Sequence, residues 1–284
     1  GVSCRSKRAK EHFELAAFIT TALVVYSIFV GALFLFQRNM MYYPGHHLPT
    51  PAESGVAEMA VVRVTTGDGL ELTSWYGKAT AIKPTIVFFQ GNAGTIAGRS
   101  FKVRRYLDAG YGVFLVGYRG YGGNPGMPME QGLYADGRAA LRYLENVGVP
   151  SAEWIFYGES LGSGVAVEMA HEWARRIPVG AVILEAPFTS MGDAAAEHYP
   201  FVPARMLVRD RYASVDKIAD IRAPLLIIHG EADRTVPKAL GKRLFDAASE
   251  PKQAHWISGG GHNNLYDFGV TALVEQFITD VASD

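Results

Sequence analysis

The stretch Trp154-Ile155-Phe156-Tyr157-Gly158-Glu159-Ser160-Leu161-Gly162 decides the fold of this chain. Its first four residues form an apolar run typical of a buried strand, and a helical pattern follows. Between them, Gly-x-Ser-x-Gly is typical of a sharp strand-to-helix turn that points the serine oxygen away from the backbone. Two glycines are needed because this turn is too tight for a Cβ beside a strained residue. Ser160 is therefore the candidate nucleophile, and the N–H of Leu161 is left free to hold an oxyanion.

Short β-type runs alternate with helical patterns on both sides of this turn. Strands are predicted at residues 59–66, 70–77, 85–89, 112–117, 154–157, 180–184, 224–229 and 253–258, and helices at residues such as 129–146 and 165–176. Asp-Gly turn chemistry at 67–69 predicts that the first two strands form an antiparallel hairpin. The alternation predicts an α/β fold with a mainly parallel sheet of about eight strands flanked by helices. In such a sheet, ligands bind at the carboxyl ends of the strands.

The loop after the predicted strand at 224–229 carries the candidate acid. Asp233 lies just beyond the strand end, where it could accept a hydrogen bond from an imidazole and stabilise the imidazolium. Glu231 is the alternative acid in the same loop. The structural alternative is that Asp233 only caps the helix that follows Pro237.

A glycine-rich segment after the last predicted strand carries the candidate base. Gly259-Gly260-Gly261 precedes His262 and predicts a flexible loop in which the imidazole can swing against the nucleophile. An imidazole exchanges protons near neutral pH, which suits a general base. The other histidines fit less well: His255 falls within a strand, His229 is a strand-end structural residue, His46 and His47 lie in the predicted tether, and His171 and His198 precede the acid.

The turn after the predicted strand at 85–89 is the second source of backbone donors. It reads Gln90-Gly91-Asn92-Ala93-Gly94. Preorganised N–H groups stabilise the negative oxygen of a tetrahedral intermediate, so we assign the oxyanion hole to the N–H groups of Asn92 and Leu161. Glycine-rich turns are routine in this architecture, and a turn without a catalytic part is the alternative.

Composition limits the class of protein. The chain has 284 residues, with 27 basic against 28 acidic side chains, which gives no electrostatic footprint for a nucleic-acid partner. Cys4 is the only cysteine, so an intramolecular disulfide is excluded. We find no metal-ligand spacing, phosphate loop or dinucleotide fingerprint, so no metal or nucleotide cofactor is implied. The oligomeric state is unknown.

Residues 15–36 form an uncharged apolar run long enough to cross a membrane at about 1.5 Å per residue. We expect a retained transmembrane anchor; the alternative is a cleaved signal peptide ending near Val30-Gly31-Ala32. Basic residues are concentrated in residues 1–14, which predicts a cytoplasmic N-terminus and an extracytoplasmic catalytic domain, in a periplasm or lumen. Myristoylation of Gly1 is disfavoured because Arg5 occupies the position that requires serine or threonine.

Residues 37–57 are predicted to be a short tether, with Tyr42 and Tyr43 at about the level of the lipid headgroups. Residues 58–284 then form the catalytic domain. A short linker keeps an active site close to the membrane, which favours lipids or membrane-bound acyl groups as substrates.

These motifs together resemble α/β-hydrolases, and more closely the membrane-anchored Bem46-like and ABHD13/ABHD17-like serine hydrolases. The resemblance runs from Phe36 to the C-terminus and rests on six motifs besides the Asp233 loop: residues 37–44, 90–94, 118–122, 158–162, 185–190 and 261–262. It implies a catalytic triad of Ser160, Asp233 and His262 and a cofactor-free hydrolysis of ester, thioester or amide bonds.

Two departures from the family pattern stand out. Gln90 occupies a position where relatives usually carry histidine, which we expect to alter loop packing more than chemistry. The depalmitoylating relatives use an acylated cysteine-rich N-terminus instead of a spanning helix, so depalmitoylation transfers weakly to this chain.

A cap is predicted at about 191–213, where His198–Pro203 and Met206–Val208 could line an acyl pocket or pack as ordinary helix residues. Arg205, Arg209 and Arg211 could face an anionic headgroup, although a solvated basic face is the commoner meaning. The leading hypothesis is a membrane-anchored serine hydrolase of the carboxylesterase, lipase or thioesterase type, with peptidase activity possible, acting through an acyl-enzyme. The alternatives are an acyltransferase with the same triad and a catalytically silent interaction protein of this fold.

Overall fold

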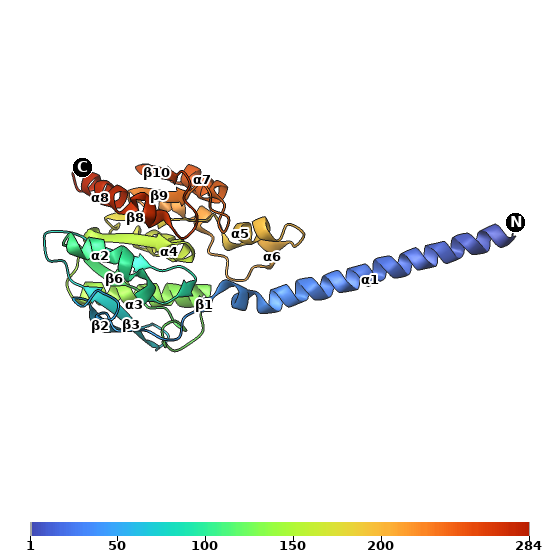
Figure 1. The fold of residues 1–284 in the computed structure, drawn as a ribbon, viewed down its shortest axis with the longest axis horizontal. Coiled ribbons are helices and arrows are strands. Elements are labelled where there is room, and N and C mark those ends of the chain that lie inside the picture. The colour runs from blue at the N-terminus through green and yellow to red at the C-terminus, as the bar shows by residue number, and fades with distance from the viewer. Residues whose placement is uncertain (1, 284) are drawn as a thin grey trace. The chain divides into compact units, whose positions relative to one another are not determined.

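The computed structural model describes residues 2–283, which divide into two compact units, Gly1–Met40 and Met41–Asp284 (Figure 1). The first unit is almost entirely one helix, α1 (Val2–Met41). Its segment Lys10–Met41 is long and apolar enough to cross a membrane, and none of the apolar window is buried in protein. The predicted span at 15–36 lies inside this segment.

The second unit is built on an eight-stranded sheet with the order β10-β9-β8-β7-β4-β6-β3-β2. The strands are β2 (Ala60–Thr65), β3 (Glu71–Gly77), β4 (Thr85–Phe89), β6 (Gly112–Leu115), β7 (Trp154–Glu159), β8 (Ala181–Glu185), β9 (Leu225–Gly230) and β10 (Lys252–Ile257). The six strands from β10 to β6 are parallel, β3 is antiparallel to β6, and β2 is antiparallel to β3. Two further short strands, β1 (Tyr43–Pro44) and β5 (Ala93–Gly94), pair in parallel with each other.

Helices cover both faces of this sheet (Figure 1). The α-helices of this unit are α2 (Ser100–Asp108), α3 (Glu130–Asn146), α4 (Leu161–Trp173), α5 (Met191–His198), α6 (Ala204–Leu207), α7 (Lys238–Ala247) and α8 (Val270–Val281). Short 3₁₀ helices lie at Ile96–Arg99, Ser151–Glu153, Ser214–Asp216, Ile218–Asp220 and Leu265–Phe268.

Successive side chains along the strands point to opposite faces of the sheet and pack into two hydrophobic cores. Phe89 and Phe156 pack with residues of α3, α4 and α7 on one face. Phe88 and Tyr157 stack with ring centroids 4.7 Å apart on the other face, with residues of α2 and α8. Because both faces are covered, the central strands are apolar throughout, which is what made them recognisable in the sequence.

The predicted strands are confirmed, with small differences at their ends. The predicted strand at 112–117 ends at Leu115 in β6, and the helix predicted from residue 165 begins at Leu161 in α4. The second difference arises because the chain passes from the serine turn into the helix without an intervening loop, so polar and glycine residues occupy the first helical turn.

The tether differs from its prediction. Helix α1 continues to Met41, and the next residues already belong to the folded domain. Tyr42 is only 5% exposed, and its hydroxyl lies 2.9 Å from the hydroxyl of Tyr212 and 3.1 Å from Asp210. Tyr42 is therefore part of the core of the domain and not of a free tether. A tyrosine satisfies its polar tip equally well in a core that supplies a hydrogen-bond partner.

Candidate active site

Three side chains from distant parts of the chain meet at the carboxyl edge of the parallel strands. The Oγ of Ser160 lies 3.0 Å from Nε2 of His262. The Nδ1 of the same imidazole lies 2.7 Å from Oδ2 of Asp233. A hydroxyl, an imidazole and a carboxylate are therefore connected in series, which is the arrangement that activates a serine oxygen as a nucleophile.

Ser160 lies at the turn between β7 and α4 with strained backbone angles, φ 50° and ψ −115°. Its N–H donates to the carbonyl of Glu185 at 2.8 Å, which holds the turn against β8. A Cβ on Gly158 would come within 2.6 Å of the Cα of Ser163, and a Cβ on Gly162 would collide with the carbonyl oxygen of Phe89. The need for glycine on both sides of the serine thus has a steric cause in the structure.

Asp233 is held by its own loop. Its Oδ1 accepts hydrogen bonds from the N–H groups of Thr235 and Val236, both at 2.8 Å, which leaves Oδ2 for His262. Burial acts to raise the pKa of Asp233, but hydrogen bonds from His229 and His262 outweigh it and hold the pKa well below its usual range. The carboxylate therefore stays ionised beside the imidazole.

The glycine-rich loop before His262, predicted to be flexible, is held by hydrogen bonds in the structure. The carbonyl of Gly260 accepts from the N–H of Ala232 at 2.8 Å, and the N–H of Gly261 donates to the side chain of Asn264 at 2.8 Å. A Cβ on Gly230 would collide with Gly260, so these glycines serve the close approach of two loops. That approach brings His262 to Asp233.

The other residues weighed from the sequence are not part of the series from Ser160 to Asp233, although Nε2 of His229 lies 3.4 Å from Oδ2 of Asp233 and supports that carboxylate. Glu231 pairs with Lys238 at 2.7 Å at the surface. His229 is fully buried, and its Nε2 lies 2.8 Å from the carbonyl oxygen of Val236. This agrees with the structural role predicted for it. His198 is exposed and contacts the carbonyl of Thr235 at 2.7 Å.

The two predicted oxyanion donors lie on segments that approach each other. Leu161 is the first residue of α4, where N–H groups have no acceptor within the helix. Asn92 follows the end of β4, next to the turn, since Gly162 abuts Phe89. Their assignment as an oxyanion hole remains a prediction.

A buried network of charges beneath the serine was missed in the sequence. Arg99 donates to both oxygens of Glu159 at 3.0 and 3.1 Å and to the carbonyl of Ala93 at 2.8 Å. Lys102 lies 2.8 Å from Glu185 and 3.4 Å from Glu159. Arg99 thus ties the turn that carries Ser160 to the loop that carries Asn92. The available signal was a charged residue inside an apolar strand end, Gly-Glu-Ser-Leu-Gly.

In this network, direct pairing between opposite charges outweighs the effect of burial on the pKa values of Glu159 and Lys102. Burial acts to raise the pKa of Glu159, but the charges of Lys102 and Arg99 lower it overall. Burial acts to lower the pKa of Lys102, and the carboxylates of Glu185 and Glu159 raise it overall. These side chains therefore remain charged, and each depends on its partners.

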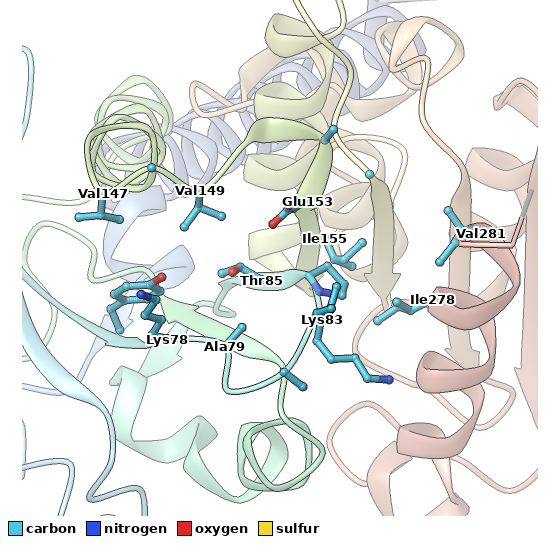
Figure 2. A pocket seen from close by; sticks show the side chains of 18 residues that line it. Lys78, Ala79, Lys83, Thr85, Val147, Val149, Glu153, Ile155, Ile278 and Val281 are labelled. Atoms are coloured by element: carbon cyan, nitrogen blue, oxygen red, sulfur yellow. The ribbon is translucent and has the colours of Figure 1, made fainter.

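A pocket of about 610 Å³ lies elsewhere, at the amino ends of the parallel strands (Figure 2). Its lining includes Thr85 at the start of β4, Ile155 near the start of β7, and Ile278 and Val281 of α8. Ser160 follows the opposite end of β7, five residues beyond Ile155, which is about 16 Å at ~3.3 Å per residue. This pocket is therefore separate from the hydrogen-bonded side chains at the carboxyl edge.

The predicted cap forms two short helices, α5 and α6. Phe201 and Met206 are 86% and 85% exposed, so these two side chains line no closed acyl pocket. Arg205 pairs with Asp193 of α5 at 2.6 Å. Its charge is thus paired within the cap, although the side chain is 62% exposed.

Strand order, the serine turn and the flanking helices define an α/β hydrolase. No family model matches the chain. The esterase Pf2001 of Pyrococcus furiosus has the same fold, with a TM-score of 0.68 over 84% of this chain and 98% of its own, at 18% identity.

The chain belongs to the Bem46-like α/β-hydrolase family. Protein bem46 of Schizosaccharomyces pombe is 31% identical over 86% of this chain and 85% of its own length. An uncharacterized protein of Mycobacterium tuberculosis is 40% identical over 87% of this chain and 88% of its own. Lysophosphatidylserine lipase ABHD12 of Danio rerio is 34% identical over 63% of this chain but only 51% of its own length.

Proposed function

We propose that this protein is a membrane-anchored serine hydrolase that cleaves ester, thioester or amide bonds through an acyl-enzyme. The observation that carries the proposal is the unbroken series of hydrogen bonds from Ser160 through His262 to Asp233. A scaffold without activity has no physical need for this arrangement, which argues against the silent interaction protein.

The geometry supports a two-step reaction. Ser160 Oγ attacks the carbonyl carbon while its proton passes to Nε2 of His262, and the negative oxygen is held by the N–H groups of Asn92 and Leu161. The intermediate collapses as the leaving group takes the proton from His262, which leaves an acyl-serine. Water then attacks the acyl carbon, gives its proton to His262, and frees the acid as Ser160 recovers a proton. Asp233 stays ionised and stabilises the imidazolium in both steps.

Esters of membrane lipids are the proposed substrate class. Helix α1 could span a membrane, and the folded domain begins directly after it in the sequence, so the proposed catalytic domain is tethered to the bilayer. The named lipase activity of the ABHD12 relative points the same way, although the match covers half of that protein. We place the N-terminus in the cytoplasm and the catalytic domain on the other side.

The test is fluorophosphonate labelling and ester hydrolysis by the full chain in detergent micelles. Ser160→Ala should abolish labelling and lower kcat by at least about 10⁴-fold. Ser163→Ala is the matched control, because the Ser163 hydroxyl is buried in the same turn without a partner among the described residues. Full esterase activity in Ser160→Ala would overturn the proposal.

A graded series of substrates separates the finer alternatives. Aryl esters of increasing acyl length, acyl thioesters and aminoacyl amides distinguish esterase, thioesterase and amidase activities. Added alcohols or amines reveal transfer to an acceptor other than water, which would favour the acyltransferase.

A further inference from the structure

The segment that follows the anchor helix pairs with the loop that carries the proposed oxyanion donor. In the parallel pair of β1 and β5, the N–H of Tyr43 donates to the carbonyl of Asn92 at 2.9 Å. The N–H of Gly45 donates to the carbonyl of Gly94 at 2.8 Å. The juxtamembrane chain therefore forms a strand along the backbone of this loop.

Side chains add to the pairing at Asn92. Its Nδ2 donates to the carbonyl of Met41, the last residue of α1, at 2.9 Å. The hydroxyl of Tyr121 donates to the carbonyl of Asn92 at 2.8 Å. Both the side chain and the carbonyl of Asn92 are thus held from outside the loop, which restrains the Cα of Asn92 and with it the position of its N–H.

The pairing segment is itself docked on the domain. Tyr42 is buried and contacts Tyr212 and Asp210, and the carbonyl of Gly45 accepts from the N–H of Gly122 at 2.7 Å. A Cβ on Gly45 would come within 2.9 Å of Thr95 Cγ2 and 3.2 Å of the carbonyl group of Gly94. The close approach of this strand to the loop thus depends on a residue without a side chain.

We propose that residues Met41–Gly45 are a positioning segment of the oxyanion hole. By pairing with β5, these residues orient the N–H of Asn92 toward the oxygen of the tetrahedral intermediate. This proposal rests on the proposed hydrolase function. Since the segment continues directly from α1, the same few residues connect the anchor and the active site. Because an oxyanion donor acts mainly in the transition state, loosening the segment lowers kcat and leaves KM nearly unchanged.

Gly45→Val tests this in the full chain. The added side chain should push β1 from β5 and lower kcat about 10- to 100-fold, less than the 10²- to 10³-fold that loss of an oxyanion donor costs. KM should change less than about threefold. The affinity of an alkylboronic acid, which forms a tetrahedral adduct on the serine, should fall by the same factor as kcat. The matched control is His47→Val, an exposed residue two positions beyond the segment, which should keep both values.

Thermal unfolding separates a local from a global effect. If Gly45→Val does not fold, Gly45→Ala tests the same contact with a smaller group. A folded variant of either kind with wild-type kcat and boronate affinity overturns this inference. A Ser160→Ala protein that retains activity overturns the hydrolase itself, so the two failures are distinguishable.

Discussion

At the scale of single residues, the ionised state of Asp233 matters most for the proposed chemistry. Asp233→Asn keeps the hydrogen-bond geometry but removes the charge and favours the wrong imidazole tautomer, so kcat should fall about 10³- to 10⁴-fold. Esterase assays on the purified protein measure this. Glu231→Gln, which alters the surface acid of the same loop, should stay within about twofold of the wild type. Equal losses in the two variants would remove Asp233 from the proposed triad.

Lys102 carries a second residue-scale prediction. Replacing it with methionine leaves Glu185 and Glu159 buried without their shared cation, so Lys102→Met should destabilise the fold by about 3–5 kcal/mol. Urea unfolding followed by circular dichroism gives this value. The control Lys242→Met removes an exposed pair with Asp246 and should leave the midpoint unchanged. An unchanged midpoint in Lys102→Met would show that the buried carboxyls are neutral.

Acid should destabilise the protein because several carboxyl groups have a lower pKa in the folded state than in the unfolded state. Within residues 2–283, which the structure describes, six carboxyl groups have pKa values below their ordinary range: Glu53, Glu58, Asp68, Glu159, Asp193 and Asp233. Their unfolded forms bind protons at higher pH than the folded forms, so they contribute stability above about pH 4–5 and lose it as the pH falls. Asp136 opposes them, because burial raises its pKa to about 6. The urea concentration at the midpoint of unfolding should decrease as the pH is lowered below about 5. An equal midpoint at pH 4 and pH 7 would contradict this.

At the scale of elements, the contact of α4 with the end of β4 holds the nucleophile in place. A methyl group on Gly162 meets the carbonyl of Phe89, so Gly162→Ala should abolish fluorophosphonate labelling or lower the unfolding temperature by several degrees. Gly98→Ala is the control, since a Cβ there meets no atom within 4 Å. Differential scanning fluorimetry with the labelling assay decides the outcome. Wild-type values in both variants would show that the turn tolerates a side chain.

The strands and the three hydrogen-bonded side chains could be predicted because each carries a local signal. Continuous apolar runs indicate strands covered on both faces, and Ser160, Asp233 and His262 each follow a strand end. The pairing of β1 with β5 could not be predicted from the sequence, because it joins backbone groups about 50 residues apart and leaves no side-chain pattern. The Arg99–Glu159 pair was equally hidden, since its partners belong to separate elements.

At the scale of the whole molecule, the chain joins an apolar helix to a domain with its own core. Ser160 lies at the carboxyl ends of the parallel strands, and the pocket of about 610 Å³ lies at their amino ends. If the proposed membrane-anchored hydrolase acts at the serine edge of its sheet, the side of the membrane on which the domain lies limits its substrates. Orientation is therefore the property of the whole chain that most constrains function.

Cysteine labelling tests that orientation. Cys4 is the only cysteine, and it precedes the apolar segment. Ile82 is fully exposed on a loop of the domain, so Ile82→Cys adds a reactive thiol beyond the segment. In bacterial spheroplasts, a membrane-impermeant maleimide should label Ile82→Cys in a Cys4→Ser background and spare the wild-type chain, because the basic residues before the helix favour retention in the cytoplasm. Detergent should expose both thiols. Labelling of Cys4 alone in intact spheroplasts would place the catalytic domain in the cytoplasm.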